Sequence, residues 1–226
     1  MAQENEFELT NLGEKIVTSI GKYRLVTQPL IRQRFGKNEH EVKNEIRRLF
    51  QRKLIAGYPF VNNERYYRFT YHACKKFGFP RRLSSAPGIQ ALKMNYGILH
   101  FCFQPTKPRR ILTLAQVQTL LYGDDAKTDN QAIKAGQFYI PDGSGFSLSH
   151  VFVDCRSAAP RLVKKAFSFV KDRRENRAFR ELIVRNEFAI SFVTESEGKA
   201  RAIQEAAKRR KLPLCEVHIC PHLQYL

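Results

Sequence analysis

The sequence contains no tryptophan and only two methionines, and its five cysteines include no CxxC pair. An odd number of scattered cysteines does not suit a disulfide framework, so we expect reduced thiols. No Gly-rich phosphate-binding loop occurs, which removes the basis for an ATPase. There is no continuous apolar span or lipidation signal, and the first ten residues are acidic and polar, unlike a secretory signal. We therefore expect a cytoplasmic protein with no membrane partner.

Acidic side chains are also scarce. The chain has 21 Asp and Glu against 39 Lys and Arg, which gives a net charge of +18 and a pI near 10.0. The excess is spread along the chain: residues 1–80 hold 15 basic and 8 acidic side chains, and residues 81–226 hold 24 and 13. A hydrophobic fraction of 43% with 17 Phe is ample for a packed core. A folded protein with this charge favours a polyanionic partner, most simply double-stranded DNA.

The stretch 38–70 has the clearest local signals. Asn38 can cap a helix, and Glu41, three residues later, can complete a capping box. Apolar residues then recur at helical spacing and predict one inward face: Val42, Ile46, Leu49 and Phe50. The opposite face is polar and basic: Lys43, Asn44, Arg47, Arg48, Gln51 and Arg52. Beyond residue 55, aromatic residues on both sides of an Asn62-Asn63 turn predict a β-hairpin.

Two shorter helical patterns precede this stretch, over residues 10–22 and 28–35. Thr27 is a plausible cap for the second, with Pro29 in its first turn. Helix, helix, turn, helix and hairpin is the order of a winged helix-turn-helix, so we predict such a domain over residues 1–80. The residues that we expect to bind DNA are Lys43, Asn44, Arg47, Arg48, Gln51, Arg52, Arg65 and Arg68.

Within this set, four residues lie three or four positions apart and form the stripe expected to enter the major groove: Lys43, Asn44, Arg47 and Gln51. Arg48 and Arg52 flank the stripe and are expected nearer the phosphates, while Arg65 and Arg68 of the hairpin would follow the DNA backbone or minor groove. Two plainer interpretations stay open. The charged face can be merely solvated, and the tyrosines of the hairpin can serve to pack it on the helices.

Residues 81–226 alternate between helical and strand patterns, after a domain boundary expected at residues 78–82. Helices are predicted over 84–103, 114–122, 158–171, 177–184 and 195–211, and strands over 137–140, 146–155, 188–193 and 214–219. The segment 104–110 is predicted to be a basic, proline-containing loop. Two strands followed by alternating helices and strands predict an α/β domain with a mixed sheet, so the protein is expected to be α+β overall.

One segment of this second domain resembles the core of the PD-(D/E)XK nuclease superfamily: Pro141-Asp142, a turn and strand, then Asp154-Cys155-Arg156 and a helix. The resemblance implies that Asp142 and Asp154 bind Mg²⁺ and that a lysine orients or activates the attacking water. Arg156 stands where that lysine is expected, and an arginine stays protonated. Lys164 or Lys165 would then have to supply the amine. We expect a nuclease-like scaffold without cleavage, with a Mg²⁺-dependent endonuclease as the alternative.

A winged helix followed by this degenerate core resembles the replication-relaxation family of plasmids and other mobile elements. The resemblance spans most of the chain, from about residue 10 to residue 220. It implies a role in replication, relaxation or transfer of element DNA, with no cofactor needed for binding and a replication or transfer protein as a candidate partner. A transcription or copy-number regulator that forms a homodimer through its second domain is a further alternative.

Four potential metal ligands also cluster near the end of the sequence: Cys215, His218, Cys220 and His222. These residue types suit Zn²⁺. Their spacing, however, is not that of a familiar zinc finger, and simple alternation along a strand places His218 and Cys220 on one face. No Ser-His-Asp or Cys-His nucleophile arrangement can be assembled from the sequence.

Overall fold

The computed structural model describes residues 8–123, 138–143 and 147–226. The chain divides into two compact units, Met1–Leu99 and His100–Leu226. The division falls within helix α5 (Ile89–Cys102), which the sequence-based boundary assigns wholly to the second domain. Residues 137 and 146, where two of the predicted strands begin, lie outside the described residues.

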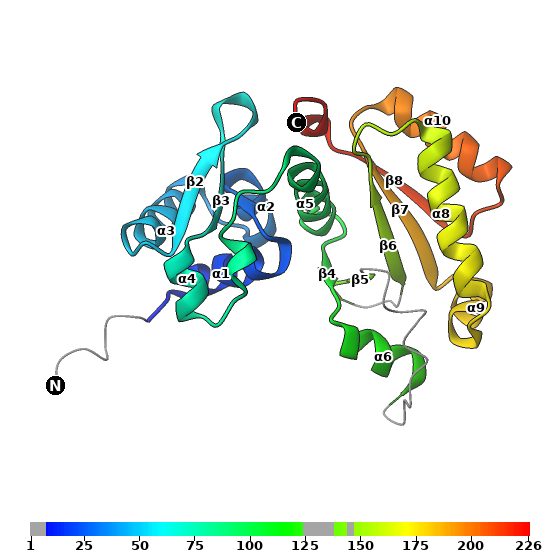
Figure 1. Ribbon diagram of the computed structural model, residues 1–226, viewed down its shortest axis with the longest axis horizontal. Helices are drawn as coiled ribbons and strands as arrows, with labels where there is room; N and C mark the ends of the chain where they lie inside the picture. Colours follow the sequence, from blue (N-terminus) through cyan, green and yellow to red (C-terminus); the bar gives the residue numbers. More distant parts are fainter. Residues whose placement is uncertain (1–7, 124–137, 144–146) are drawn as a thin grey trace. The chain divides into compact units, whose positions relative to one another are not determined.

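The first unit consists of helices followed by an antiparallel hairpin (Figure 1). Its elements are α1 (Asn11–Tyr23), β1 (Val26–Thr27), α2 (Gln28–Phe35), α3 (Glu39–Gln51), β2 (Ile55–Pro59), β3 (Arg65–Phe69), α4 (Tyr71–Lys76) and most of α5, with short 3₁₀ turns at Val61–Asn63 and Arg81–Leu83. The three strands form one antiparallel sheet in the order β1-β3-β2, with Tyr58 opposite Tyr66. The predicted helices and hairpin are confirmed.

The start of α3 is fixed by the predicted capping box. The Asn38 side chain accepts a hydrogen bond from the Glu41 amide at 2.9 Å, and the Glu41 carboxylate accepts one from the Asn38 amide at 3.1 Å. These two bonds satisfy backbone donors that have no partner within the helix. Thr27 does precede α2 and Pro29 lies in its first turn, but the Thr27 side chain makes no capping hydrogen bond.

The inward face of α3 differs from the prediction at one position. Val42, Ile46 and Leu49 are buried as expected, but Phe50 is 53% exposed. Each residue turns the helix by about 100°, so the position after Leu49 lies beyond the apolar arc. Glu45 lies on the buried side instead, at 8% exposure.

Arg68 is a second correction, because it lies inside the first unit and is only 3% exposed. Its guanidinium donates to the Leu83 carbonyl at 2.9 Å and to the Arg24 carbonyl at 3.3 Å. Side chains alternate along a strand, and on β3 this alternation buries Tyr66 and Arg68 while Arg65 stays exposed. Arg68 therefore holds the hairpin to two neighbouring segments and is not available to an external ligand.

The second unit is a mixed five-stranded sheet with helices. Besides the end of α5, it contains β4 (Arg109–Ile111), α6 (Leu114–Tyr122), β5 (Phe138–Pro141), β6 (Leu148–Val153), α8 (Ala159–Arg174), α9 (Arg177–Val184), β7 (Phe188–Thr194), α10 (Glu197–Arg209), β8 (Cys215–Ile219) and a 3₁₀ turn at Pro221–Gln224. The strand order is β4-β5-β6-β7-β8, antiparallel from β4 to β6 and parallel from β6 to β8. This confirms the mixed sheet. The loop predicted over 104–110 is wrong at its end, because β4 begins at Arg109.

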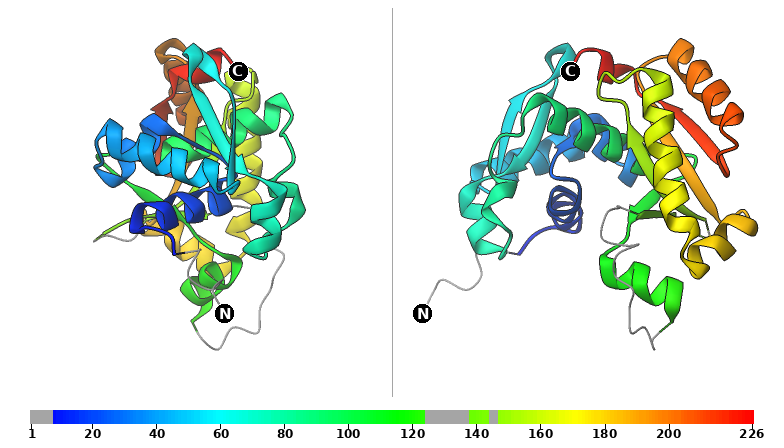
Figure 2. Two further views of the ribbon diagram at one scale, coloured as in Figure 1. Left: turned by 90° about the vertical axis from the view of Figure 1, so that its left-hand side faces the viewer. Right: turned by 45° about the vertical axis from the view of Figure 1, so that its right-hand side comes forward.

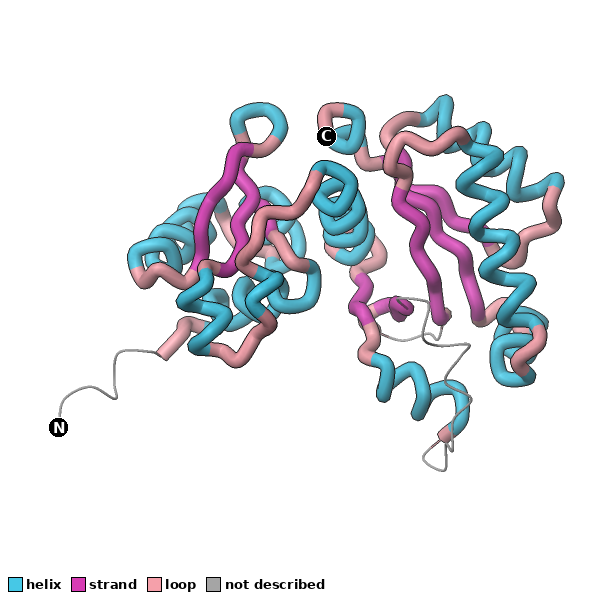
Figure 3. Tube along the Cα trace, in the orientation of Figure 1, coloured by secondary structure: helices cyan, strands magenta, loops and turns pink. Residues whose placement is uncertain are grey.

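The core of the second unit lies between the sheet and the helices that follow β6. All seven residues of β7 are buried, as expected for an interior strand of a parallel layer. Phe188, Ile190 and Phe192 of β7 pack in one cluster with Leu162 of α8 and Ile203 of α10. Figure 2 shows α8 and α10 side by side against this layer, and Figure 3 shows β6, β7 and β8 running together.

The buried guanidinium of Arg68 gives a stability prediction. Arg68→Ala is expected to lower the free energy of unfolding by about 2 kcal/mol or more, because the buried Leu83 carbonyl and the part-buried Arg24 carbonyl lose their donor and a cavity forms. Arg65→Ala, on the exposed side of the same strand, serves as the control and is expected to change it by less than about 0.5 kcal/mol. Urea unfolding followed by circular dichroism measures both variants. Equal effects would show that Arg68 does not hold the hairpin.

Candidate nucleic-acid interface

The exposed face of α3 brings together the four residues predicted to enter the groove. Lys43, Asn44, Arg47 and Gln51 are all exposed. At 3.6 residues per turn they occupy an arc of about 100° on one side of the helix. Among the described residues, none of the four takes part in a side-chain hydrogen bond or an ion pair. The helix therefore presents two cationic and two amide side chains that are not committed to the fold.

Two further residues extend this face, and the sequence-based prediction missed both. His40 and the half-exposed Phe50 project within the same part of the helix surface, so the uncommitted face is wider than the predicted stripe. The signal for Phe50 is its position one step beyond Leu49, which turns its side chain out of the apolar arc even though an aromatic residue suits the core.

Arg48 and Arg52, predicted to lie nearer the phosphates, are only partly exposed and have protein partners. Both donate to the carbonyl of Glu8, at 3.4 Å and 3.3 Å. Arg48 also lies 4.0 Å from the Glu45 carboxylate. These two arginines thus connect α3 to the segment that precedes α1, and they are less available to a ligand than Lys43 or Arg47.

The hairpin aromatics pack within the first unit. The Tyr58 and Tyr66 rings stack at 5.3 Å, and Phe60 meets Tyr66 edge-on at 5.9 Å. Burial raises the pKa of Tyr66. At the tip, Asn62 and Asn63 both adopt left-handed backbone conformations, a geometry that asparagine tolerates better than most residues. Of the two hairpin arginines, only Arg65 is exposed.

In the second unit, the structure does not bring Asp142 and Asp154 together. Phe138 of β5 pairs with His150 of β6 and Tyr139 pairs with Ser149, so the end of β5 lies beside the start of β6. Asp142 follows β5, whereas Asp154 follows the far end of β6. Six residues of strand separate the two positions by about 20 Å at roughly 3.3 Å per residue. Mg²⁺ ligands lie within about 2.1 Å of the ion, so the pair predicted from the sequence does not form one Mg²⁺ site.

The two carboxylates also have different surroundings. Asp142 is partly exposed and lies 4.0 Å from Arg110. Asp154 is fully buried, accepts from the Ser157 amide at 2.9 Å and from the Thr194 hydroxyl at 3.2 Å, and forms an ion pair with Lys199. Asp154 therefore joins the end of β6 to the end of β7 and the start of α10.

Lys199 is the residue that sequence reasoning missed here. Burial lowers the pKa of its ammonium, but the hydrogen bonds and charges of Asp154 and Glu195 outweigh burial and leave that pKa raised. The lysine thus stays protonated beside the carboxylate, as a structural ion pair requires. No spacing in the sequence links Lys199 to Asp154, because they are 45 positions apart and meet only through the parallel pairing of β6 with β7.

The predicted amine donors are not arranged around either carboxylate. Arg156 lies in the loop after β6 with a left-handed backbone, and its side chain is exposed. Lys164 and Lys165 lie in the second turn of α8 and are also exposed. In the described part of the chain, no ion pair joins any of the three to Asp142 or Asp154.

The four residues considered for Zn²⁺ do not converge. Cys215 and His218 lie on opposite faces of β8, because side chains alternate along a strand. Burial raises the pKa of the Cys215 thiol to about 11 and that of the Cys220 thiol to about 12. A Zn²⁺ site needs thiolates. Within residues 8–123, 138–143 and 147–226, no cluster of three or more His, Cys, Asp or Glu side chains could hold a metal.

Glu216, on the same strand, is the centre of an ion network that the sequence did not reveal. Its carboxylate lies 2.8 Å from Arg109 of β4 and 2.7 Å from Lys107. Arg109 is almost fully buried and its guanidinium lies 4.2 Å from the centre of the Phe101 ring. The nearby His218, whose Nε2 lies 3.4 Å from the carboxylate, and the charges of Lys107 and Arg109 hold the pKa of Glu216 far below its usual value, against the effect of burial. The network joins β4 and β8, the two terminal strands of the sheet.

No protein-family model matches the chain, and neither a curated protein nor a solved structure is significantly similar to it. In the described parts of the chain, no helix is long and apolar enough to cross a bilayer. Function is therefore inferred from the residues themselves. Of the candidate sites, the exposed face of α3 is the one whose predicted residues lie together on one side of a helix.

The Glu216 network predicts a pH dependence of stability. Because the folded pKa lies below the unfolded value of about 4.3, the stabilisation is complete above about pH 5 and is lost as pH falls further. Glu216→Gln is expected to cost roughly 2 kcal/mol at pH 7, since it leaves buried Arg109 without its counter-charge, and less near pH 3. The control Glu205→Gln alters an exposed pair on α10 and is expected to cost at most about 0.5 kcal/mol.

Urea midpoints measured for wild type and both variants at several pH values check this expectation. A deficit of Glu216→Gln that stays constant from neutral to acid pH would contradict it, because the carboxylate would then not be the titrating group.

Proposed function

We propose that this protein binds double-stranded DNA through its first unit, which acts as a winged helix-turn-helix and places α3 in the major groove. The observation that carries the proposal is the exposed face of α3, where Lys43, Asn44, Arg47 and Gln51 have no partners among the described residues. A helix face that is merely solvated does not require a continuous row of cationic and amide side chains without partners. Charged faces of ordinary surface helices usually include acidic residues and internal pairs, as α10 does with Arg201–Glu197 and Arg209–Glu205.

The order of elements supports this use of α3. Helix, short strand, helix, helix and two-stranded hairpin is the order of a winged helix, and in helix-turn-helix proteins the second helix of the pair enters the groove. Here α2 and α3 are that pair. The positive charge of the chain would add a sequence-independent attraction to the phosphates.

The chemistry of the face suits base recognition. Arginine and lysine donate to the O6 and N7 acceptors of guanine, and asparagine and glutamine pair with adenine in a bidentate manner. Phe50 adds an apolar surface of the kind that contacts the thymine methyl group. Arg47 lies between Lys43 and Gln51 on the helix surface, so we assign it the central position in the groove.

For the second unit we propose a scaffold role without cleavage. Its order of α5, β4, α6, β5, β6, α8, α9 and β7, with β4 to β6 antiparallel and β7 parallel to β6, is compatible with a PD-(D/E)XK-like core that carries α6 and α9 as additions. The carboxylates that resemblance assigned to Mg²⁺ are at opposite ends of β6, and Asp154 is occupied by Lys199. On the resemblance to the replication-relaxation family, we propose that the DNA binding serves replication, relaxation or transfer of a mobile element.

Arg47→Ala is the direct test of the interface. We expect it to weaken binding to a duplex DNA panel by about 1–3 kcal/mol, which is roughly 5- to 150-fold in Kd. Lys22→Ala removes the same charge from an exposed position on α1 and is expected to change Kd by less than about twofold. Fluorescence anisotropy over a series of salt concentrations gives both values. Equal losses of affinity in the two variants would show that only the net charge matters. The proposal would be wrong if the wild-type protein showed no salt-sensitive binding to DNA.

The scaffold role predicts that DNA stays intact. Supercoiled, linear and single-stranded DNA incubated with the protein and Mg²⁺ or Mn²⁺ should show no cleavage above that of the Asp142→Ala protein. Nicking by wild type that is lost in Asp142→Ala would make the second unit a metal-dependent nuclease and contradict the scaffold role.

A further inference from the structure

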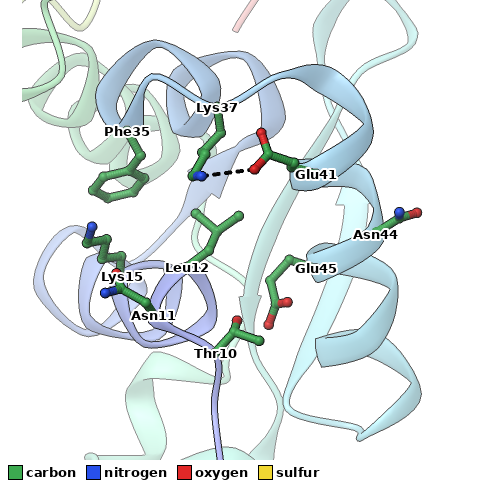
Figure 4. Close-up of a pocket in the computed structure, with 9 residues that line it drawn as sticks. All are labelled: Thr10, Asn11, Leu12, Lys15, Phe35, Lys37, Glu41, Asn44 and Glu45. Carbon is green, nitrogen blue, oxygen red and sulfur yellow. Dashed lines mark hydrogen bonds and ion pairs between the residues drawn. The ribbon is translucent and has the colours of Figure 1, made fainter.

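A pocket of about 560 Å³ lies inside the first unit, between the start of α1, the end of α2 and the start of α3 (Figure 4). Its size falls in the usual range for small-molecule sites, roughly 300–1,000 Å³. The residues that line it are Thr10, Asn11, Leu12, Lys15, Phe35, Lys37, Glu41, Asn44 and Glu45. Apolar and polar groups are thus mixed, as is common where a ligand must be both buried and oriented.

Glu45 is the unusual member of this lining. Its side chain is only 10% exposed, and its Oε1 atom is buried with no hydrogen-bond partner. The nearest cation is Arg48, whose Nη1 lies 4.0 Å from the other carboxylate oxygen. A buried carboxylate oxygen without a donor is costly and is rare in folded proteins. Figure 4 shows the carboxylate of Glu45 extending from α3 toward Thr10.

The fold makes room for this carboxylate. A Cβ atom added at Gly13 would lie 2.5 Å from Glu45 Oε1, so a glycine is needed in the first turn of α1. The partial positive charge at the start of α1 favours an anionic side chain at this place. Glu45 is therefore held between α3 and the start of α1, while its Oε1 atom still lacks a donor.

The second carboxylate of the pocket, that of Glu41, has a hydrogen-bond donor for each of its oxygens. Glu41 accepts from Lys37 at 2.9 Å through one oxygen and from the Asn38 amide at 3.1 Å through the other. These bonds lower the pKa of Glu41, the Lys37 bond most. Lys37 is thereby also committed. Lys15, the other cation of the lining, lies 5.8 Å above the Phe35 ring. Among the pocket carboxylates, Glu45 is thus the acceptor that remains for a ligand.

We propose that this pocket binds a small organic cation, with a protonated primary amine or guanidinium of the ligand donating to the Glu45 carboxylate. Charge-assisted hydrogen bonds of this kind are the strong ones, and here the acceptor is already removed from water. Leu12 and Phe35 would cover the apolar part of the ligand. The pocket shares Asn44 with the exposed face of α3, but Glu45 lies on the buried side of that helix, and the cation site does not depend on DNA binding.

Agmatine, which has an amine at one end and a guanidinium at the other, is the probe. We expect a titration of the full chain to shift the amide NMR signals of Gly13 and Thr10 in a saturable manner. Glu45→Gln should weaken agmatine binding by at least about tenfold, because it keeps the size of the side chain but removes its charge. Glu39→Gln, an exposed carboxylate outside the pocket, is the control and should leave the Kd unchanged.

A second variant guards against misfolding of Glu45→Gln. Asn11→Trp replaces an exposed residue of the lining with a bulky one, and we expect it to block agmatine while the circular dichroism spectrum stays that of wild type. The proposal is overturned if agmatine at about 10 mM moves no pocket signal. Equal affinity of wild type and Glu45→Gln, or binding that Asn11→Trp does not reduce, would overturn it as well.

Discussion

The buried guanidinium of Arg68 is the contact on which the architecture of the first unit depends. It joins β3 to the connection after α1 through the Arg24 carbonyl and to the segment after α4 through the Leu83 carbonyl. Burial lowers the pKa of Arg68, yet an arginine remains charged, so those carbonyl groups must stay close to it. With the hairpin fixed in this way, α3 packs by its inner face and leaves its outer face uncovered.

Local patterns predicted most of the first unit because its elements are defined by neighbours in sequence. The Asn38 and Glu41 bonds span three residues, and the change from helical to alternating spacing marks the hairpin directly. The errors at Phe50 and Arg68 have another origin. Periodicity shows that a helix or strand has two faces, but which residues at the margin of a face are covered depends on packing partners elsewhere in the chain.

In the second unit the elements were predictable and their long-range contacts were not. Strand β4 has three residues and, in the described part of the sheet, pairs with β5 alone, so its own sequence resembles a loop. Glu216 and Arg109 lie 107 positions apart in the sequence. Their side chains meet only in the folded sheet, where they connect its two terminal strands. Asp142 and Asp154 have the residue types and spacing of a metal site, but spacing alone does not reveal at which end of β6 each one lies.

Asp154 shows that the residue type alone does not determine whether a carboxylate binds a ligand in a protein as basic as this one. A carboxylate at the carboxyl end of a parallel strand is well placed to bind a ligand in an α/β sheet. The same position lies next to the start of α10, the helix that follows the neighbouring strand β7. Here Lys199 of α10 forms an ion pair with Asp154, and the Thr194 hydroxyl of β7 donates a hydrogen bond to it. On α3 the balance is reversed, since no acidic side chain among the described residues pairs with Lys43 or Arg47. The ability to bind a partner therefore depends on which charges the fold leaves unmatched, and that is decided by tertiary contacts.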